Sequence, residues 1–476
     1  MNATDLRRPE RVPRLGPLVL LVASACGTSA PPRDPPSIQE FRADRDSTPV
    51  GERAQLVAVF SGTSAEIEGL GAVQSGQAVE TGVLSGSTAF TLKVRRAGQE
   101  AVAQLTVAVH YRDRIRPLSD SPVGRQAHVA MVLPDGSALL MGGNTSEAIN
   151  TPDLDSTQRF DVATEELTAG PRLALSARDR EFTVPVPLQG GAFLLVGGGI
   201  NAGVGLGIHP GALVQRFDPT LQRFTRSADL TAVRSGDTAA TLLADGRVLM
   251  TSGSFPVEAA SETYDPATGA WTRGGDMRVA RRGHTATLLA DGRVLIAGGI
   301  ACCIVTAQTI SETYTASAEL YDPSSGKFEI TGPLTMRRGS HRATLLHDGR
   351  VLISGGIGGA DPDSDVTLAD SEVFDPIAGT FSALGSFQIA RLEHSAVLLN
   401  DGRVLVVGGT REDTQFRLAV PQTELFDPSI GQWAAGPRLD PAWLGLTATL
   451  LGNGKVLLFG GADGSGFPRA NVFLFE

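Results

Sequence analysis

Lysine and cysteine are both scarce in this chain of 476 residues. Lysine occurs only at Lys93, Lys327 and Lys455, so nearly all of the positive charge is arginine, and there are 3 cysteines. The 41 basic side chains are outnumbered by 51 acidic ones, which gives a net charge of −10. This balance argues against nucleic acid or anionic lipid headgroups as partners. The 42% share of hydrophobic residues excludes a disordered chain.

Long hydrophobic runs are also lacking, and none reaches the ~18 residues of a membrane-spanning helix. The apolar stretch 15–25 follows four arginines and ends in Ala23-Ser24-Ala25, which predicts a secretory signal peptide over residues 1–25. With Cys26, this ending resembles a bacterial lipobox, in which the cysteine is diacylated. The resemblance implies lipidation of Cys26 and an outer membrane lipoprotein of the cell envelope, attached to the membrane only through this lipid. Cleavage without lipidation would give a secreted protein.

The other two cysteines, Cys302 and Cys303, are adjacent in the sequence. They are either two thiols or a vicinal disulfide, which an oxidising compartment would permit. Such a disulfide would be strained, because neighbouring Cα atoms lie ~3.8 Å apart, below the usual range for a disulfide.

Two segments separate the signal peptide from the rest of the chain. Residues 26–37 are rich in proline and predict an extended linker. Residues 38–110 read as short strands divided by Gly and Ser turns, with Phe90, Leu92 and Val94 on one face of a strand. This pattern predicts a small β-sandwich that resembles bacterial immunoglobulin-like domains in architecture, without the Cys…Trp…Cys core of antibody domains. We expect it to act as a spacer.

From residue 111 onward the chain repeats a unit of about fifty residues. The best copies are HTATLLADGRVLIAGG at 284–299, HRATLLHDGRVLISGG at 341–356 and HSAVLLNDGRVLVVGG at 394–409. With four weaker copies, the last glycine of each unit falls at positions 143, 198, 253, 299, 356, 409 and 461. Six copies are followed by a segment such as LYDPSSGKF or VFDPIAGTF.

Each unit reads as four antiparallel strands. Asp-Gly tolerates the positive φ angles of a two-residue hairpin turn between the first and second strands. Asp-Pro-x-x-Gly gives a type I turn between the third and fourth. The units resemble kelch repeats and galactose-oxidase-type propellers over about 366 residues. The expected fold is therefore all-β: a seven-bladed kelch β-propeller over 111–476, preceded by the small immunoglobulin-like β-sandwich.

The last unit lacks its fourth strand. We expect residues 112–118, RDRIRPL, to supply it and to close the ring between the two chain ends, because this leaves no sheet edge exposed. The alternation of strands places the tight turns on one side of the ring. It places the long second-to-third-strand loops and the connections between blades on the other, which is where function is usually carried.

The loop side supplies the candidate binding residues. Four arginines stand three residues before a histidine, and a fifth stands alone in the second unit. We expect these Arg and His side chains to hydrogen-bond loop carbonyls between neighbouring blades, and alternatively the arginines to rim a mouth that attracts anions. The longest loop, 300–318, adds two cysteines and a tyrosine. The candidates are Arg125, Arg180, Arg281, Arg338, Arg391, Cys302, Cys303 and Tyr314.

Two metal sites can be considered. Asp361, Asp363 and Asp365 have the alternate spacing of calcium ligands, but Val366 stands where such a loop needs glycine, which favours a solvated acidic loop. The galactose oxidase resemblance implies a copper held by two His and two Tyr, one Tyr linked to Cys. The chain has 4 tyrosines and no Tyr-His dipeptide. The sequence therefore predicts no metal, no cofactor and no catalytic residue.

These features favour a monomeric binding or scaffold protein that recognises a protein or carbohydrate ligand through its loop side. The alternative is a carbohydrate-modifying enzyme, either a galactose-oxidase-like copper radical oxidase or a kelch-type sugar epimerase. A Cys–Tyr crosslink at Tyr314 would favour the oxidase.

Overall fold

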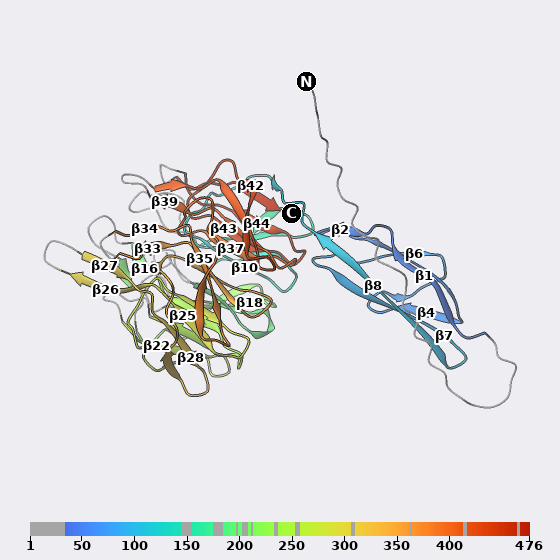
Figure 1. Ribbon diagram of the computed structural model, residues 1–476, viewed down its shortest axis with the longest axis horizontal. Helices are drawn as coiled ribbons and strands as arrows, with labels where there is room; N and C mark the ends of the chain where they lie inside the picture. Colours follow the sequence, from blue (N-terminus) through green and yellow to red (C-terminus); the bar gives the residue numbers. More distant parts are fainter. Residues whose placement is uncertain are drawn as a thin grey trace, which may run out of the picture. The chain divides into compact units, whose positions relative to one another are not determined.

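The computed structural model divides the chain into two units, Met1–His110 and Tyr111–Glu476, both built from β-strands (Figure 1). Within the described residues no helix is long and apolar enough to cross a membrane. The structure describes residues 34–143, 155–174, 184–196, 199–201, 208–210, 213–232, 237–252, 258–305, 310–361, 364–412, 417–463 and 467–476.

The first unit contains two sheets. One has the order β1-β3-β6 and the other β2-β8-β7-β4-β5. A single apolar cluster that includes Phe41, Leu56, Leu92 and Val107 draws on strands of both sheets. The assignment of this unit as immunoglobulin-like stays a prediction. The strands are β1 (Ser37–Ala43), β2 (Ser47–Pro49), β3 (Gln55–Ser61), β4 (Ser64–Ile67), β5 (Gly71–Ala72), β6 (Ala78–Glu80), β7 (Thr88–Arg96) and β8 (Gln99–His110).

The second unit contains seven four-stranded antiparallel sheets within the described residues, numbered here as blades in chain order. Blades 1 to 3 are β10 (Val129–Val132), β11 (Ala138–Met141), β12 (Thr157–Phe160) and β13 (Leu167–Ala169); β14 (Val184–Pro187), β15 (Phe193–Val196), β18 (Val214–Asp218) and β19 (Arg223–Arg226); and β20 (Ala239–Leu242), β21 (Val248–Thr251), β22 (Ser261–Asp265) and β23 (Ala270–Arg273).

Blades 4 to 7 follow the same plan. They are β24 (Thr285–Leu288), β25 (Val294–Ala297), β28 (Ala318–Asp322) and β29 (Lys327–Ile330); β31 (Arg342–Leu345), β32 (Val351–Ser354), β35 (Ser371–Asp375) and β36 (Thr380–Ala383); β37 (Ser395–Leu398), β38 (Val404–Val407), β41 (Gln422–Asp427) and β42 (Gln432–Arg438); and β43 (Thr447–Leu450), β44 (Val456–Phe459), β45 (Val472–Phe475) and β9 (Ile115–Pro117).

The first strands of the blades form a closed ring. Each first strand contacts the first strand of both neighbouring blades, and β43 of blade 7 contacts β10 of blade 1. The second strand of every blade is fully buried, as Val294–Ala297 illustrates. This arrangement explains the repeated apolar sequence after each tight turn, because both faces of that strand pack against neighbouring blades.

The third and fourth strands are joined by a repeated aromatic pair. Tyr321 and Phe328 of blade 4 have ring centroids 4.8 Å apart, and Tyr264 and Trp271 of blade 3 are 5.2 Å apart. These residues flank the Asp-Pro turn in the sequence, so the cross-strand register brings them opposite each other. Such pairs add to the stability gained from burial of their surface.

The ring closes through β9, which pairs with β45 in the register Leu474↔Arg116. The Leu118 N–H donates to Val472 O at 2.8 Å. Because ladder hydrogen bonds alternate along the strand, Pro117 occupies a position whose missing N–H is not needed. Residues from both ends of this unit therefore complete blade 7.

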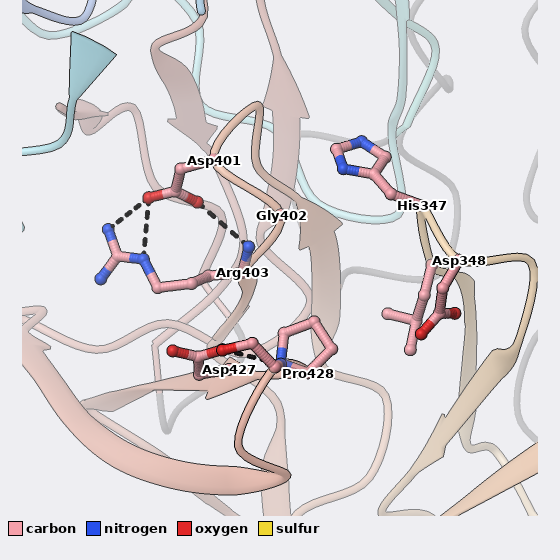
Figure 2. Close-up of a pocket in the computed structure, with 9 residues that line it drawn as sticks. His347, Asp348, Asp401, Gly402, Arg403, Asp427 and Pro428 are labelled. Atoms are coloured by element: carbon pink, nitrogen blue, oxygen red, sulfur yellow. Dashed lines mark hydrogen bonds and ion pairs between the residues drawn. The ribbon is translucent and has the colours of Figure 1, made fainter. Parts of the chain in front are cut away.

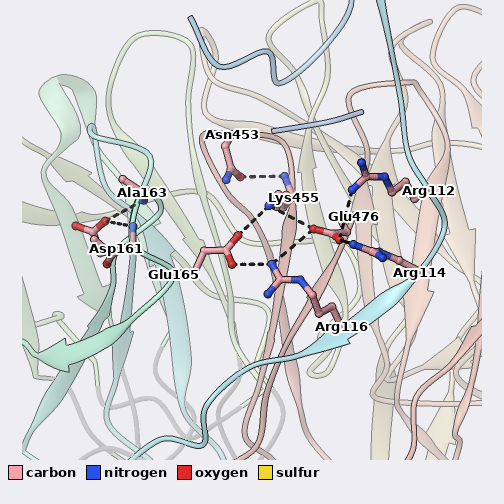
Figure 3. Close-up of polar contacts among 10 residues, drawn as sticks. Arg112, Arg114, Arg116, Asp161, Ala163, Glu165, Asn453, Lys455 and Glu476 are labelled. Atoms are coloured by element: carbon pink, nitrogen blue, oxygen red, sulfur yellow. Dashed lines mark hydrogen bonds and ion pairs between the residues drawn. The ribbon is translucent and has the colours of Figure 1, made fainter. Parts of the chain in front are cut away.

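A charge cluster surrounds this closure (Figure 3). The buried Glu476 carboxylate contacts Arg114, Arg116 at 3.6 Å and Lys455 at 3.3 Å. Glu165 of blade 1 bonds Arg116 at 2.6 Å and Lys455 at 2.8 Å. Burial alone would raise the pKa of Glu165, but the bonds from Lys455 and Arg116 lower it below its usual value. The closing strand is thus tied to both blade 7 and blade 1.

Candidate functional site

The predicted loop-side arginines lie inside the blades. Arg281 is fully buried, donates to Gly298 O at 2.9 Å and Ser317 O at 2.8 Å, and pairs with the fully buried Glu319 at 2.8 Å. These bonds hold the loop between the second and third strands to its own blade. The same burial, with an exposed fraction of 0%, applies to Arg125, Arg281, Arg338 and Arg391.

In this structure the four guanidinium groups are enclosed by protein oxygens and are not exposed to a ligand, so ligand binding by these arginines stays a prediction. Three blades pair the arginine with a glutamate, as Arg391 does with Glu424 at 2.6 Å. Blade 1 uses the neutral Gln158, and burial lowers the pKa of Arg125 to about 10. Arg180 lies outside the described residues.

The histidines join neighbouring blades. His284 Nε2 lies 2.7 Å from Thr251 Oγ1 of the preceding blade, and His128 Nε2 lies 2.8 Å from Thr447 Oγ1. His341 and His394 make equivalent contacts at 3.1 and 3.0 Å. Burial lowers the pKa of His128 and His284 to about 3, so these imidazoles are neutral. The expected contacts between blades are thus made by histidine, whereas the arginines bond within their own blades.

The residue just before each of these histidines adopts a positive φ. In blades 3 and 7, where Thr238 and Leu446 stand at the histidine position, the preceding residue does the same. This set, the mouth ring, comprises Ala127, Asp237, Gly283, Ser340, Glu393 and Gly445, with φ between 51° and 67°. The Gly283 N–H donates to Asp237 O at 2.9 Å, and the Glu393 N–H to Ser340 O at 3.1 Å. The mouth ring therefore links blades around the loop-side opening of the channel. Four of its members are not glycine, and each costs ~1–3 kcal/mol of backbone strain.

Arg342 stands at the start of β31, directly after His341, and the sequence analysis missed it. Other copies of the repeat carry Thr285, Ser395 or Thr447 at this position. An arginine in place of a small hydroxyl residue therefore distinguishes this copy in the sequence. Its Nε donates to His394 O of the next blade at 2.6 Å. Because β31 is an innermost strand and the side chain is exposed, Arg342 lies at the channel opening.

Hairpins extend the loop side beyond the four-stranded sheets. They are formed by β16 (Gly199–Asn201) with β17 (Ile208–Pro210), β26 (Ile300–Val305) with β27 (Ile310–Tyr314), β30 (Arg337–Gly339) with β33 (Ile357–Gly359) and β34 (Val366–Thr367), and β39 (Thr410–Glu412) with β40 (Arg417–Ala419). In Figure 1 the labelled strands β26, β27, β33, β34 and β39 lie on the same side of the propeller.

The hairpins of blades 5 and 6 meet. The Glu412 N–H donates to Thr367 Oγ1 at 3.2 Å, which joins β39 to β34. Val366 and Leu418 on these hairpins are 55% and 42% exposed, although they are large apolar residues. We call the surface formed by β33, β34, β39 and β40 the hairpin layer. Isolated apolar residues are common on protein surfaces, and these two lie on hairpins that contact each other.

The acidic candidates are not gathered into a calcium site in the described structure. Asp365 pairs with Arg337 at 3.1 Å, and Asp363 lies outside the described residues. Among the described residues, no three His, Cys, Asp or Glu side chains are grouped as a metal site. The expected solvated acidic loop, which includes Asp361, stays a prediction.

The longest loop forms the hairpin β26–β27. Its register places Cys302 opposite Thr313 and Cys303 opposite Glu312, but the two cysteine side chains lie outside the described part. Tyr314 is half-buried, and its carbonyl accepts a hydrogen bond from Arg337 Nη1 at 3.3 Å. The Tyr314 ring packs against the backbone of Gly339, where an added Cβ would lie 2.9 Å from it.

A second candidate lies on the opposite side of the ring, among the tight turns of blades 5 and 6 (Figure 2). This open cavity of about 480 Å³ is lined by residues that include His347, Asp401, Arg403 and Asp427. Asp401 accepts from the Arg403 N–H at 3.0 Å, and Asp427 from the Ser429 N–H at 2.9 Å. These aspartates stabilise their own turns, so the cavity is the weaker candidate.

Comparisons with known proteins agree with the fold. The chain is 24% identical to kelch-like protein 15 of Mus musculus over 253 residues, which are 49% of this chain and 39% of that protein. It is 28% identical to spermatocyte protein spe-26 of Caenorhabditis elegans over 171 residues, 35% of this chain and 28% of that protein. It is 24% identical to beta-scruin of Limulus polyphemus over 178 residues, 36% of this chain and 18% of that protein. The matches thus span less than half the length of these relatives, and no family model matches.

Among solved structures, a fungal alcohol oxidase of the AA5 family in complex with copper superposes with a TM-score of 0.61, at 17% identity and over 76% of each chain. This likeness shows the fold alone. The closed ring of four-stranded blades makes the second unit a β-propeller. With the repeats and these relatives, the protein is a kelch-repeat propeller with a galactose-oxidase-like fold.

The residues of this chain do not fit the copper site that the resemblance implies. Four histidines are engaged between blades, and Tyr264 and Tyr321 are buried in the aromatic pairs of their blades. These four of the 7 histidines and two of the 4 tyrosines therefore serve the blades and do not supply ligands for a copper ion. No oxidative step is derived from this fold.

Proposed function

We propose that this propeller is a protein-binding module whose ligand occupies the loop-side channel opening and the hairpin layer. The observation that carries this proposal is the contrast between the two sides of the ring. The turn side repeats tight turns of nearly constant length, whereas the loop side combines the strained mouth ring, Arg342 and hairpins that differ between blades and touch between blades 5 and 6. Strained backbone and variable loops on a rigid scaffold are typical of binding sites.

A display library of random peptides tests this proposal. Peptides enriched on the wild-type protein would be measured against the double variant Val366→Asp, Leu418→Asp. The matched control is Ile377→Asp, Ile430→Asp, which adds the same charge at the Asp-Pro turns, where the two isoleucines are 98% and 63% exposed. We expect at least a tenfold loss of affinity in the hairpin-layer variant and none in the control.

Two outcomes would contradict protein binding at this surface. Equal affinity in both double variants would place the ligand elsewhere. If the protein enriches no peptide but binds on a carbohydrate array, the ligand is a glycan and not a protein. Because charged substitutions at exposed positions rarely unfold a protein, the thermal midpoint of each variant should stay near that of the wild type.

We also propose that the protein is exported and anchored by a lipid on Cys26. The support is the basic, apolar and small-residue order of residues 1–25 followed directly by cysteine. Labelling with radioactive palmitate in a bacterial host is expected to mark the wild type and not Cys26→Ala. Equal labelling of the two, or none in either, would contradict the anchor.

A further inference from the structure

The loop-side channel opening contains an arginine, Arg342, that forms no ion pair with any residue in the described part of the chain. Four buried arginines nearby are enclosed by carbonyl and side-chain oxygens. Arg342 differs, because the hydrogen bond it makes to the described protein uses Nε and a backbone carbonyl, His394 O at 2.6 Å. This bond leaves both Nη groups without a hydrogen bond to any residue that the structure describes.

The acidic residues of the mouth ring do not take up these Nη groups. Both carboxylate oxygens of Glu393 face Arg417, at 3.1 and 3.3 Å. Asp237 pairs with Arg282. Desolvation by the surrounding innermost strands lowers the pKa of Arg342, an effect that the charge of Glu393 partly offsets. Among the described residues, no carboxylate forms an ion pair with this cation at the channel opening.

We propose that Arg342 is a carboxylate-binding residue, which receives an aspartate or glutamate side chain of the protein ligand at the channel opening. This inference rests on the proposed function for the source of the carboxylate. Two parallel Nη donors match the two oxygens of a carboxylate, as in bidentate arginine pairs. The nearby carboxylate of Glu393 repels a doubly charged phosphate more than a singly charged carboxylate.

The repeat itself supplies the test variant. Thr285 and Thr447 hold the equivalent position in blades 4 and 7, and their hydroxyls contact the histidine of the next blade at 3.1 and 2.8 Å. Arg342→Thr therefore places a residue that this scaffold already accepts there. Arg223→Met is the matched control, because Arg223 is exposed on β19, the fourth strand of blade 2, outside the hairpin layer and the channel opening.

The first experiment uses acetate alone as the probe. The thermal midpoint is measured as acetate replaces chloride at constant ionic strength and pH 7.5. A ligand that binds the folded state raises the midpoint, so we expect a saturable rise for the wild type and Arg223→Met, and loss of that rise in Arg342→Thr. An equal rise in all three proteins overturns the proposal. A larger Arg342-dependent rise with phosphate than with acetate overturns the choice of carboxylate.

The second experiment uses the peptides enriched on the wild type. Replacing one critical Asp or Glu by its amide should weaken binding to the wild type at least tenfold and binding to Arg342→Thr less than twofold, which is the signature of a coupled pair. If peptides bind and no acidic residue couples to Arg342, this inference fails and the proposed function stands. If no peptide binds, the proposed function fails, while the acetate response still decides the anion site.

Discussion

At the scale of single residues, the same amino acid has two different roles in this propeller. Arg281 and its equivalents are internal braces, fully buried against Glu or Gln and loop carbonyls. Arg342 is exposed at the channel opening. The distinction follows from which groups each guanidinium meets, because a buried cation is retained only when its donors are satisfied.

Arg281→Met tests the role of a buried brace. Removing the cation leaves Glu319 buried, with the N–H groups of Arg278 and Val279 as its donors. We expect the unfolding free energy to fall by about 3–5 kcal/mol, measured by urea denaturation. The double variant Arg281→Met, Glu319→Leu should recover most of this loss. Arg273→Met, whose partner Asp276 is exposed, should change stability little, and an equally large loss there would contradict the assignment.

The buried histidines predict a pH dependence of stability. The folded pKa of His284, about 3, lies below its unfolded value of ~6.5, so the unfolded state binds more protons below pH 6.5. This contribution is fully present above pH 6.5 and is lost as the pH falls towards 3, by about 1.4 kcal/mol per pH unit. His284→Gln should make the slope between pH 6 and pH 4 shallower by that amount. Identical slopes for the wild type and His284→Gln would refute the effect.

At the scale of the elements, close packing of the extra hairpins requires glycine at particular positions. Gly358 in β33 has a φ of 151°, and a Cβ there would lie 2.1 Å from Arg337 O on β30. Gly359 has a φ of 150°, but its nearest neighbour would be 3.5 Å away. The two glycines therefore have nearly the same φ, but only Gly358 has a neighbouring atom too close for a Cβ.

This difference gives a prediction for the hairpin layer. Gly358→Ala should separate β33 from β30, so that amide hydrogen exchange in both strands accelerates at least tenfold while blade 5 stays protected. Gly359→Ala bears a similar φ penalty without the clash and should accelerate exchange less. If the two variants behave alike, strain at φ rather than close approach is the cause.

At the scale of the whole molecule, the ring depends on residues from both ends of the propeller unit. β9 supplies the outer strand of blade 7, and Tyr111 just before it donates to Gly454 O at 2.6 Å and stacks on Phe475. Arg403 lies over the Tyr111 ring, 5.9 Å from its centroid. Closure therefore involves aromatic packing and ion pairs as well as the strand ladder.

Two shortened chains test this closure. A chain that starts at Tyr111 retains β9 and should be monomeric in size-exclusion chromatography, with one cooperative unfolding transition. A chain that starts at Ser119 exposes the edge of β45, so we expect a lower urea midpoint and association through that edge. Monomeric behaviour with equal stability in both chains would show that β9 is dispensable.

Much of the propeller could be predicted from the sequence because its determinants are local. The Asp-Gly turn, the Asp-Pro turn and the alternation of the strands all lie within one unit of about fifty residues. Seven copies of this unit therefore specify seven similar sheets. The candidate site was predicted less well. The R-x-x-H pattern indicated a structural role for both residues. It did not show that the arginine bonds within its own blade whereas the histidine contacts the neighbouring blade.

The sequence by itself determined the all-β class, the repeated blade and the placement of the variable loops on one side of the ring. Only the tertiary structure decided which arginines are buried, that the mouth ring adopts positive φ, and that Arg342 lies at the channel opening. Burial and backbone strain arise where segments that are distant in the sequence pack together, and no local pattern contains that information.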